Sequence, residues 1–357
     1  MTRVVILFGG RSAEHEVSIL SARNIWLALD RTRFLPALIS IDKQGRWRHE
    51  PDATLARAVG DPTKLALDPT APPVAWAEAA GPDDIVFPIM HGTTGEDGVV
   101  QGLLEFLDVG YVGAGVLGSA IGMDKDVSKR LLREAGLPVV DFRTFTATEV
   151  GAAPASVTAA AQALGYPLFV KPANTGSSVG VARVPTADAL MPAVRGALAF
   201  DRKVILEAAV DAREIECAVL GNDDPQASVP GEIIVGGRHV FYSYDAKYVD
   251  PDGATLRIPA DVAPDVRERV RALSIRTFQV LDLAGMARVD FFLDRKTGNL
   301  FVNEVNTIPG FTAMSMYPKM WEAAGMSQTQ LVSRLVELGI QRRDARRALA
   351  RTGPAGR

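Results

Sequence analysis

Two pairs of polar residues in the last quarter of the chain have types and spacing that suit metal and phosphate chemistry. Arg288 and Asp290 form one pair, and Glu304 and Asn306 form the other. Residues i and i+2 of a strand share one face, so the members of each pair point to the same side of a sheet. The turn-forming segment Asp294–Asn299 predicts a hairpin that brings Asp290 within about one position of Glu304.

This register would oppose two carboxylates, and opposed like charges destabilise a sheet. A bound divalent cation removes the repulsion, and two carboxylates with an amide oxygen suit Mg²⁺, which shares its ligand shell with substrate phosphates. Arg288 on the same face has the chemistry to hold a phosphoryl group or a developing oxyanion. A solvated ladder of Arg–carboxylate pairs is the alternative. The apolar flanks Met286-Ala287 and Phe291–Leu293 predict burial and disfavour it.

A loop of small residues, Lys171–Gly180, joins two predicted strands, Pro167–Lys171 and Ser178–Val184. Gly, Ser and Thr let backbone N–H groups approach a polyanion, and Lys171 adds a point charge. A plain hairpin turn is the alternative. The flanking strands and the lysine favour a loop that covers phosphate groups.

The segment Gly9–Ser18 follows the predicted first strand, Val4–Phe8. Ligands of open α/β sheets collect at the carboxyl ends of strands. Helix N-termini favour anions there, so the two glutamates of this segment indicate a ligand ammonium group instead. The alternative is a helix N-terminus with acidic first-turn residues, which accounts for one glutamate. His91 follows another predicted strand, Asp84–Met90. A lone histidine is more often structural than catalytic, but its location at the end of a strand favours a functional role.

The dinucleotide pattern GxGxxG occurs once, at Gly113–Gly118. The strand before it would be only Gly110–Val112, and Met-Asp-Lys-Asp follows where a dinucleotide-binding unit has a second buried strand. We therefore interpret this segment as a tight turn that joins two domains.

The elements that must position these residues begin with an alternating pattern. Strands at Val4–Phe8, Phe34–Ile41 and Asp84–Met90, with a helix over Val17–Leu29, predict an α/β unit with a parallel sheet. A single helix is predicted over Gly118–Gly136, ended by its last glycine and the proline that follows.

Two α+β regions follow that helix. The second region alternates strands and helices, and the third holds more strands, the hairpin and a long helix at Pro264–Leu283. A final helix is predicted at Lys319–Gly339, and the Arg-rich segment Gln341–Arg357 predicts a solvated helix end that frays.

Composition narrows the class of protein. The chain has 357 residues, 39 basic and 42 acidic, with a formal net charge of −3 and 47% hydrophobic residues, so two or three globular domains are expected. The lack of a basic excess argues against a nucleic-acid partner. The apolar runs fall short of the roughly 18–20 residues of a membrane span. The single Cys217 excludes an intrachain disulfide and a cysteine-based zinc site, and these features together predict a cytoplasmic protein.

Taken together, the motifs resemble those of the D-alanine–D-alanine ligases, a family of the ATP-grasp superfamily, from about Val4 to about Leu338. Six ordered motifs carry the resemblance: Phe8-Gly9-Gly10 with Ser12–Ser18, Met90-His91-Gly92 with Gly95–Gly98, Met123-Asp124-Lys125, Lys171-Pro172 with Gly176–Gly180, Tyr244–Tyr248, and Asn303–Gly310.

The resemblance implies a mixed α/β and α+β ATP-grasp fold of three domains, with ATP between the central and C-terminal ones. The expected divisions are an N-terminal substrate domain (1–121), a central subdomain (122–206), a C-terminal subdomain (207–341) and a basic tail (342–357). It also implies a homodimer.

The implied reaction joins two D-alanine molecules. ATP phosphorylates the carboxylate of the first, the amine of the second attacks the acyl phosphate, and D-alanyl-D-alanine, ADP and phosphate leave. The product serves peptidoglycan precursor synthesis.

The resemblance also implies residue roles. Glu14 would hold the first D-alanine's ammonium with His91 nearby, and Arg288 and the Gly310 N–H would stabilise the oxyanion. Ser315 and Met316 would meet the second D-alanine. Two Mg²⁺ (or Mn²⁺) ions would be bound by Asp290, Glu304 and Asn306. ATP contacts would come from Lys125, Lys171, Ser178, Lys247, the adenine hinge Glu207-Ala208-Ala209-Val210 and the ribose-binding Glu214.

Tyr248 and Lys247 would lie on a loop over the site, with the Tyr248 hydroxyl bonded to Ser177 and Glu14. The chain departs from many family members at Ala208-Ala209, where larger residues are common. Three rival functions stay open: another ATP-grasp carboxylate–amine ligase, an NAD-dependent dehydrogenase based on Gly113–Gly118, and a non-enzymatic amino-acid-binding protein.

Overall fold

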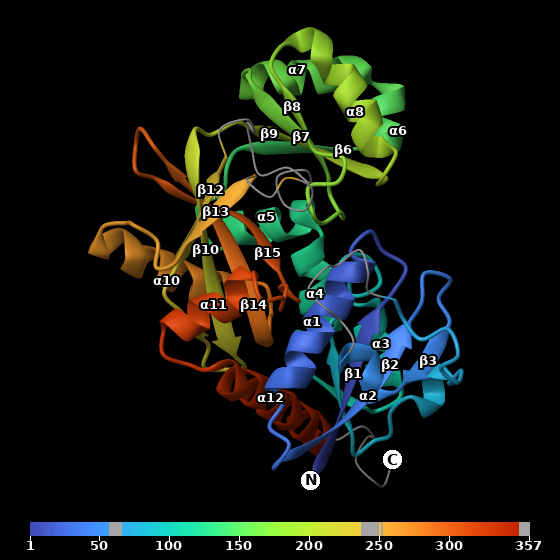
Figure 1. Ribbon diagram of the computed structural model, residues 1–357. Coiled ribbons are helices and arrows are strands. Elements are labelled where there is room, and N and C mark those ends of the chain that lie inside the picture. The colour runs from blue at the N-terminus through green and yellow to red at the C-terminus, as the bar shows by residue number, and fades with distance from the viewer. Residues whose placement is uncertain (57–65, 237–249, 251–252, 350–357) are drawn as a thin grey trace, which may run out of the picture.

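The computed structural model describes residues 1–56, 66–236, 250 and 253–349. Lys247 and Tyr248, predicted to contact ATP and the first substrate, lie outside the described residues. Three sheets organise the described part, and Figure 1 shows them as three neighbouring groups of strands around helix α5 (Lys125–Glu134).

The first sheet has the strand order β3-β2-β1-β4-β5. Its pairs β1–β2, β1–β4 and β4–β5 are parallel, as the alternating pattern predicts, and only β3 runs antiparallel. The central strand β1 is buried on both faces from Val4 to Phe8, which explains its unbroken apolar run. The strands are β1 (Thr2–Gly9), β2 (Phe34–Ile41), β3 (Trp47–Glu50), β4 (Ile85–Pro88) and β5 (Gly110–Tyr111).

Helices accompany this sheet and lead out of it. They are α1 (His15–Ala28), α2 (Asp52–Ala56), the 3₁₀ turn η2 (Trp76–Glu78), α3 (Val99–Phe106) and α4 (Val116–Met123).

The second sheet is antiparallel, with the order β6-β9-β7-β8. Its helices pack on it to form a separate hydrophobic cluster that includes Val157, Leu168 and Leu206. Figure 1 shows this unit at the top of the molecule. Its elements are β6 (Phe142–Thr146), α6 (Ala147–Ala152), α7 (Pro154–Leu164), β7 (Leu168–Pro172), β8 (Ala182–Val184), η3 (Ala187–Ala189), α8 (Leu190–Leu198) and β9 (Lys203–Ala208).

The third sheet follows the order β13-β12-β10-β14-β15, with β11 added on β10, and its pairs are antiparallel. Its strands are β10 (Ala212–Gly221), β11 (Gln226–Ala227), β12 (Gly231–Val235), β13 (Ala254–Arg257), β14 (Gly285–Asp294) and β15 (Leu300–Asn306). The described residues of this part also form the helices α10 (Pro264–Val280), α11 (Met316–Ala323) and α12 (Gln328–Ala348).

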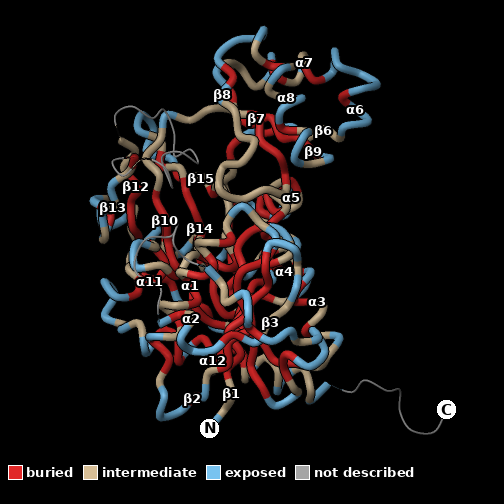
Figure 2. The backbone as a smooth tube through the Cα atoms, turned by 45° about the vertical axis from the view of Figure 1, so that its right-hand side comes forward, coloured by how far each residue is buried: buried red, intermediate tan, exposed pale blue. Residues whose placement is uncertain are grey.

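One continuous core joins the first and third sheets. It runs from Phe8 and Phe87 of the first sheet to Met286 of the third through residues of α11 and α12. The rings of Phe87 and Phe311 meet edge to face at 6.1 Å between centroids. Red segments fill this region of Figure 2, whereas the second sheet has a smaller core of its own. The first and third sheets, with the helices packed on them, therefore form one packed body.

The predicted single helix over Gly118–Gly136 is wrong, because Asp124 divides it. The Asp124 carboxylate accepts hydrogen bonds from the N–H groups of Asp126 and Val127 and caps α5, a position that aspartate favours. The backbone N–H of Lys125 donates to the Ala173 carbonyl at 3.0 Å. The break thus turns the first residue of α5 towards the loop after β7.

The predicted fraying of the Arg-rich end is also wrong as far as Ala348, where α12 ends. Arg342 donates to the Gly113 carbonyl at 2.5 Å, and Arg347 donates to the Asp108 carbonyl at 2.7 Å. These arginines meet carbonyl and carboxylate groups beside β5, so the helix end is held against the first sheet.

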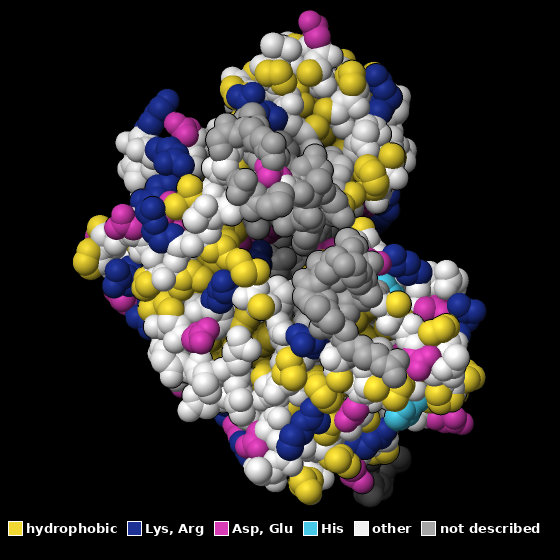
Figure 3. Space-filling view, in the orientation of Figure 1, with side chains coloured by type: hydrophobic (Ala, Val, Ile, Leu, Met, Phe, Trp, Pro, Cys, Tyr) yellow, Lys and Arg dark blue, Asp and Glu magenta, His cyan; other side chains and the backbone are white. Residues whose placement is uncertain are grey.

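Acidic and basic side chains are interspersed on the face shown in Figure 3, in keeping with the near-balanced charge. Among the described residues, no helix combines the length and apolar character that crossing a bilayer requires.

Candidate active site

The hairpin predicted for the two polar pairs is confirmed, and a register shift between Asp290 and Phe291 sets the final pairing. Asp290 on β14 lies directly across from Glu304 on β15, and Arg288 lies across from Asn306. The flanking residues Met286 and Phe291 are buried, as their apolar character predicts. Strand β10 adds a third carboxylate, because Glu216 lies across from Asp290 on its other side.

Arg288 compensates much of this negative charge. Its Nε and Nη2 donate to the two carboxylate oxygens of Asp290, each at 2.7 Å, and its Nε lies 2.9 Å from Oε2 of Glu216. Burial alone would lower the pKa of Arg288, but the charges of Asp290 and Glu216 raise it well above its ordinary value. The guanidinium is therefore a permanent buried cation, suited to stabilising an oxyanion.

The donor chemistry of the hairpin fits a magnesium ion. Asp290 and Glu304 supply carboxylate oxygens from opposed positions, and the Asn306 amide lies beside them, with its Nδ2 3.1 Å from Asp290 Oδ2. Amide N and O exchange places by a simple rotation, which would present the oxygen to a cation. No group of three His, Cys, Asp or Glu side chains within the described ranges forms a metal site by itself. Substrate phosphates would complete the coordination, as is usual for Mg²⁺.

A cluster of lysines lies next to this hairpin. Lys125 places its Nζ 3.2 Å from Glu304 and donates to the Thr175 carbonyl at 2.7 Å. Lys171 places its Nζ 2.6 Å from Glu207 Oε1, and Lys129 places its Nζ 2.8 Å from Glu207 Oε2. Lys125 and Lys171 thus approach the same region from α5 and β7, which suits a polyanion.

Glu207 is held between two buried ammonium groups. Burial would raise the pKa of its carboxyl, but Lys129 and Lys171 outweigh burial and lower it to about 2. Burial lowers the pKa of Lys129, which Glu207 partly offsets. The sequence reasoning missed Lys129, although its i+4 spacing from Lys125 on a helix was a signal that both face one side.

The predicted adenine hinge follows Glu207 at the end of β9. The Ala208 N–H donates to the Asp141 carbonyl at 3.0 Å, and the Ala209 N–H donates to the Pro167 carbonyl at 3.4 Å. Both N–H groups are therefore bonded within the protein in this conformation. An adenine base would contact the carbonyl groups of this segment or Val210. Glu214 lies on β10, two residues before Glu216 and on the same face.

Glu14 and Ser177 meet across more than 160 residues of sequence. The Ser177 hydroxyl donates to the Glu14 carboxylate, and the Ser12 hydroxyl accepts from the Glu14 N–H at 3.2 Å. A Cβ added to Gly92 would lie 3.1 Å from Glu14 Oε2, so the carboxylate lies close against that backbone. The loop of the second sheet therefore reaches the end of the first strand.

The strand predicted over Ser178–Val184 begins only at Ala182. Ser177 and Ser178 adopt φ angles of 51° and 58°, in the left-handed region, which interrupts an extended strand. This unusual backbone turns the Ser177 hydroxyl towards Glu14. The same loop carries Ser178, predicted to contact ATP.

His91 joins the first sheet to the turn after β15. Its Nδ1 lies 3.1 Å from the Ile308 carbonyl and its Nε2 3.1 Å from the Ser21 hydroxyl, which accepts from the Phe311 N–H at 3.1 Å. Burial lowers the pKa of His91, so the ring is neutral. Donation from Nδ1 to the carbonyl leaves Nε2 to accept from Ser21, so the residues around Gly310 are held in place.

Glu96 is a second buried group that the sequence reasoning left without a role. Its carboxyl accepts from the Gly92 N–H at 2.8 Å and lies 3.9 Å from the His91 ring. Burial, reinforced by the charge of Glu14, raises the pKa of Glu96 to about 8. Its place in the Gly95–Gly98 motif was the available signal.

The turn Thr307–Thr312 brings Gly310 close to Ser315. A Cβ on Gly310 would lie 2.8 Å from Ser315 Oγ, so a larger residue here would displace the Ser315 hydroxyl. Ser315 Oγ accepts from the Thr312 N–H at 2.9 Å. The Met316 side chain is buried against Gly231, so only the backbone of Met316, at the start of α11, could face a substrate carboxylate.

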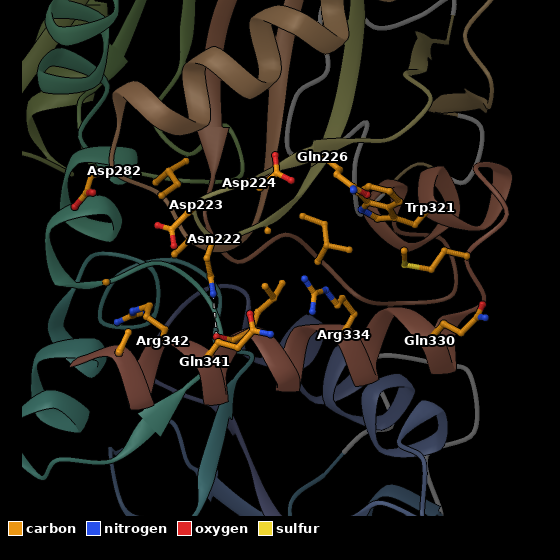
Figure 4. A pocket seen from close by; sticks show the side chains of 18 of the residues that line it. Asn222, Asp223, Asp224, Gln226, Asp282, Trp321, Gln330, Arg334, Gln341 and Arg342 are labelled. Carbon is orange, nitrogen blue, oxygen red and sulfur yellow. Dashed lines mark hydrogen bonds between the residues drawn. The ribbon is translucent and has the colours of Figure 1, made fainter. Parts of the chain in front are cut away.

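A cleft of about 1200 Å³ lies elsewhere, between α4, the β10–β11 turn and α12. Figure 4 shows Asp224 entering it from the turn and Arg334 from α12. None of the predicted site residues lines it. The predicted residues instead converge where the three sheets meet, around α5.

Comparisons with known proteins match nearly the whole chain to a single family. Family models described as "D-ala D-ala ligase N-terminus" and "D-ala D-ala ligase C-terminus" match residues 3–114 and 131–337. D-alanine–D-alanine ligase A of Chromobacterium violaceum is 48% identical over 364 residues, covering 98% of each chain.

Solved structures agree with these sequence matches. The D-alanine–D-alanine ligase of Coxiella burnetii superposes with a TM-score of 0.82 at 38% identity, covering 97% of each chain. The VanG D-Ala:D-Ser ligase of Enterococcus faecalis superposes with a TM-score of 0.79 at 31% identity, covering 95% of this chain and 99% of that one. The chain therefore belongs to the D-alanine–D-alanine ligase family and has its ATP-grasp fold.

Proposed function

We propose that this protein uses ATP to join two D-alanine molecules into D-alanyl-D-alanine, releasing ADP and phosphate, for peptidoglycan precursor synthesis. The observation that carries the proposal is the Glu14–Ser177 contact, which links an ammonium-binding carboxylate to a loop with phosphate-binding character. The 48% identity to a D-alanine–D-alanine ligase over nearly the whole chain supports it.

The first D-alanine is proposed to bind beside Glu14. The carboxylate attracts the substrate ammonium, and Ser177 fixes the carboxylate's orientation by donating to it. Neutral His91, held by Ser21 and Ile308, borders the same space. The hydroxyl of Tyr248 is proposed to join Glu14 and Ser177.

ATP is proposed to lie between the second and third sheets. Lys125, Lys171, Ser178 and Lys247 would contact the phosphates, residues 207–210 the adenine ring, and Glu214 the ribose hydroxyls. Lys171 can exchange its contact with Glu207 for a contact with a phosphate. The buried Glu207 carboxylate then still has a compensating charge, because Lys129 Nζ lies 2.8 Å from its Oε2.

Asp290, Glu304 and Asn306 would hold two Mg²⁺ or Mn²⁺ ions, which neutralise charge on the transferring phosphoryl group. Other groups of the chain stabilise the tetrahedral intermediate and bind the second substrate. Arg288 and the Gly310 N–H stabilise the oxyanion of the tetrahedral intermediate when the second D-alanine's amine attacks the acyl phosphate. Ser315 and the Met316 N–H hold the second substrate's carboxylate.

The second substrate could instead be D-serine, because one structural relative, VanG, is a D-Ala:D-Ser ligase. D-lactate is disfavoured as a second substrate, because the depsipeptide-forming members of the family that the motifs resemble lack the tyrosine that this chain keeps at Tyr248. We propose D-alanine on the higher similarity to D-alanine–D-alanine ligases. Cytoplasmic location and a homodimer follow by analogy with the family and are proposals of the same kind.

The test incubates the protein with ATP, Mg²⁺ and D-alanine and measures phosphate and dipeptide together. Phosphate release that requires D-alanine, ignores L-alanine and matches dipeptide one to one supports the proposal. Parallel reactions with D-serine and D-lactate compare the second substrates. NADH oxidation without ligation would contradict the proposal and favour a dehydrogenase.

A further inference from the structure

Glu216 completes a row of three carboxylates across neighbouring strands. It lies on β10 directly across from Asp290 on β14, which in turn lies across from Glu304 on β15. Cross-strand partners share one face of a sheet, so the three negative charges stand side by side. Glu216 is buried, with 4% of its surface exposed. A buried carboxylate beside two others persists only where a cation compensates it.

Within the described part of the chain, Arg288 is the cation that forms an ion pair with Glu216. Its Nε donates to Asp290 at 2.7 Å and lies 2.9 Å from Glu216 Oε2 as an ion pair, so the same nitrogen lies beside carboxylates of two strands. Its Nη2 holds the second oxygen of Asp290 at 2.7 Å. Because a guanidinium is planar, contacts at Nε and Nη2 fix the plane as well as the position of the group.

In the proposed function, Arg288 and a metal ion compete for the carboxylate oxygens of Asp290. A carboxylate that turns to a metal ion gives up part of its bidentate contact with Arg288. Glu216 lies on the opposite strand from Glu304 and Asn306, outside the proposed metal-binding set. Its contact with Arg288 does not depend on where the oxygens of Asp290 point.

We propose that Glu216 is a positioning residue for Arg288. It holds the guanidinium by Nε while Asp290 serves the metal site, and so keeps the remaining N–H groups aimed at the oxyanion. Glu216 itself touches neither substrate nor ATP. This inference rests on the proposed ligase function.

The first variant is Glu216→Gln, which keeps the shape and an acceptor oxygen but removes the charge. A misplacement of about 1 Å near reacting atoms can cost about a hundredfold in rate. We expect kcat to fall about ten- to hundredfold, with the KM values for ATP and D-alanine and the Mg²⁺ concentration for half-maximal rate changed less than about twofold. Affinity for a phosphinate analogue of the tetrahedral intermediate, measured by calorimetry with ADP, should fall by the same factor as kcat.

A matched control lies on the same sheet. Glu232 on β12 is buried and holds Arg213 through two contacts, at 2.7 and 2.8 Å, away from the proposed site. Glu232→Gln removes a comparable buried charge pair. It should lower the thermal midpoint at least as much as Glu216→Gln and leave kcat unchanged.

A double-mutant cycle separates positioning from a general effect on the fold. If Glu216 acts through Arg288, Glu216→Gln lowers kcat in the wild-type background and has no further effect in an Arg288→Gln background. If Glu216→Gln does not fold, Glu216→Asp keeps the charge, withdraws it from Arg288 and should show the same kcat loss.

The outcomes are distinct. An active wild type with unchanged kcat in the Glu216 variants overturns this inference alone. A shifted Mg²⁺ requirement, or additive losses in the cycle, also overturns it, because Glu216 would then act on the metal or the fold. A wild type without ligase activity overturns the proposed function itself.

Discussion

Replacing Lys129 with methionine would test the charge balance of the proposed ATP site. Lys129 and Glu207 are each 1% exposed, and their charged groups lie 2.8 Å apart. The pKa of Glu207 falls from an ordinary 4.5 to about 2 because two lysines outweigh its burial. A change of one in pKa corresponds to about 1.4 kcal/mol, so the net shift of Glu207, with burial and the two ammonium groups together, corresponds to about 3 kcal/mol at neutral pH.

Lys129→Met leaves only Lys171 to balance Glu207, so we expect the free energy of unfolding to fall by about 2 kcal/mol at pH 7. A carboxylate with a depressed pKa stabilises the fold above its unfolded value of 4.5, and this contribution fades as the pH falls towards 2. The destabilisation should therefore be largest above pH 4.5 and should shrink below it. The KM for ATP should rise about tenfold, because Lys171 is drawn back to Glu207.

Urea unfolding at several pH values and steady-state kinetics measure both effects. Lys296→Met, in the exposed β14–β15 turn, is the control and should change neither quantity. A Lys129→Met protein with wild-type stability and wild-type KM for ATP would refute the reasoning.

Three further predictions concern the other charged groups. Asp290→Asn keeps the hairpin shape, so the protein should fold normally and lose activity by orders of magnitude; near-normal turnover at ordinary Mg²⁺ would contradict the metal assignment. Because burial raises the pKa of Glu96 to about 8, the folded protein keeps its proton while the unfolded chain loses it, so Glu96 destabilises the fold increasingly as the pH rises from 4.5 to 8. Glu96→Gln should then become progressively more stable than the wild type over that range, by up to about 1.4 kcal/mol per pH unit in urea unfolding; a constant difference would count against a raised pKa. Tyr248→Phe should retain some dipeptide synthesis and gain D-lactate use, most visibly at lower pH, as measured by both products from mixed substrates. Equal product ratios from both proteins would limit Tyr248 to a structural role.

Local patterns predicted much of the fold because they depend on nearby residues. The apolar run Val4–Phe8 identified the buried first strand, and the turn Asp294–Asn299 brought Asp290 within about one position of Glu304. Both features follow from side-chain alternation and turn length within one stretch of chain. The register shift between Asp290 and Phe291, which places Asp290 directly across from Glu304, does not follow from them. The helix break at Asp124 was missed because an apolar pattern continues through it, while the cap acts on the backbone.

Contacts between distant segments could not be predicted in the same way. Glu216 meets Arg288 only because β10 pairs with β14 in one particular register, across about 70 residues of sequence. Ser21 reaches His91 and Phe311 only after α1 packs beside the turn that follows β15. The contact of Glu14 with Ser177 was predicted from the family resemblance, since no periodicity links residues so far apart.

The most direct test of the central claim is to measure the product of the protein with ATP, Mg²⁺ and D-alanine. We predict D-alanyl-D-alanine formed one to one with phosphate, lost in Glu14→Gln, which keeps a hydrogen-bond acceptor for Ser177 but removes the charge that binds the ammonium. Phosphate release without dipeptide, or full ligation by Glu14→Gln, would contradict the account.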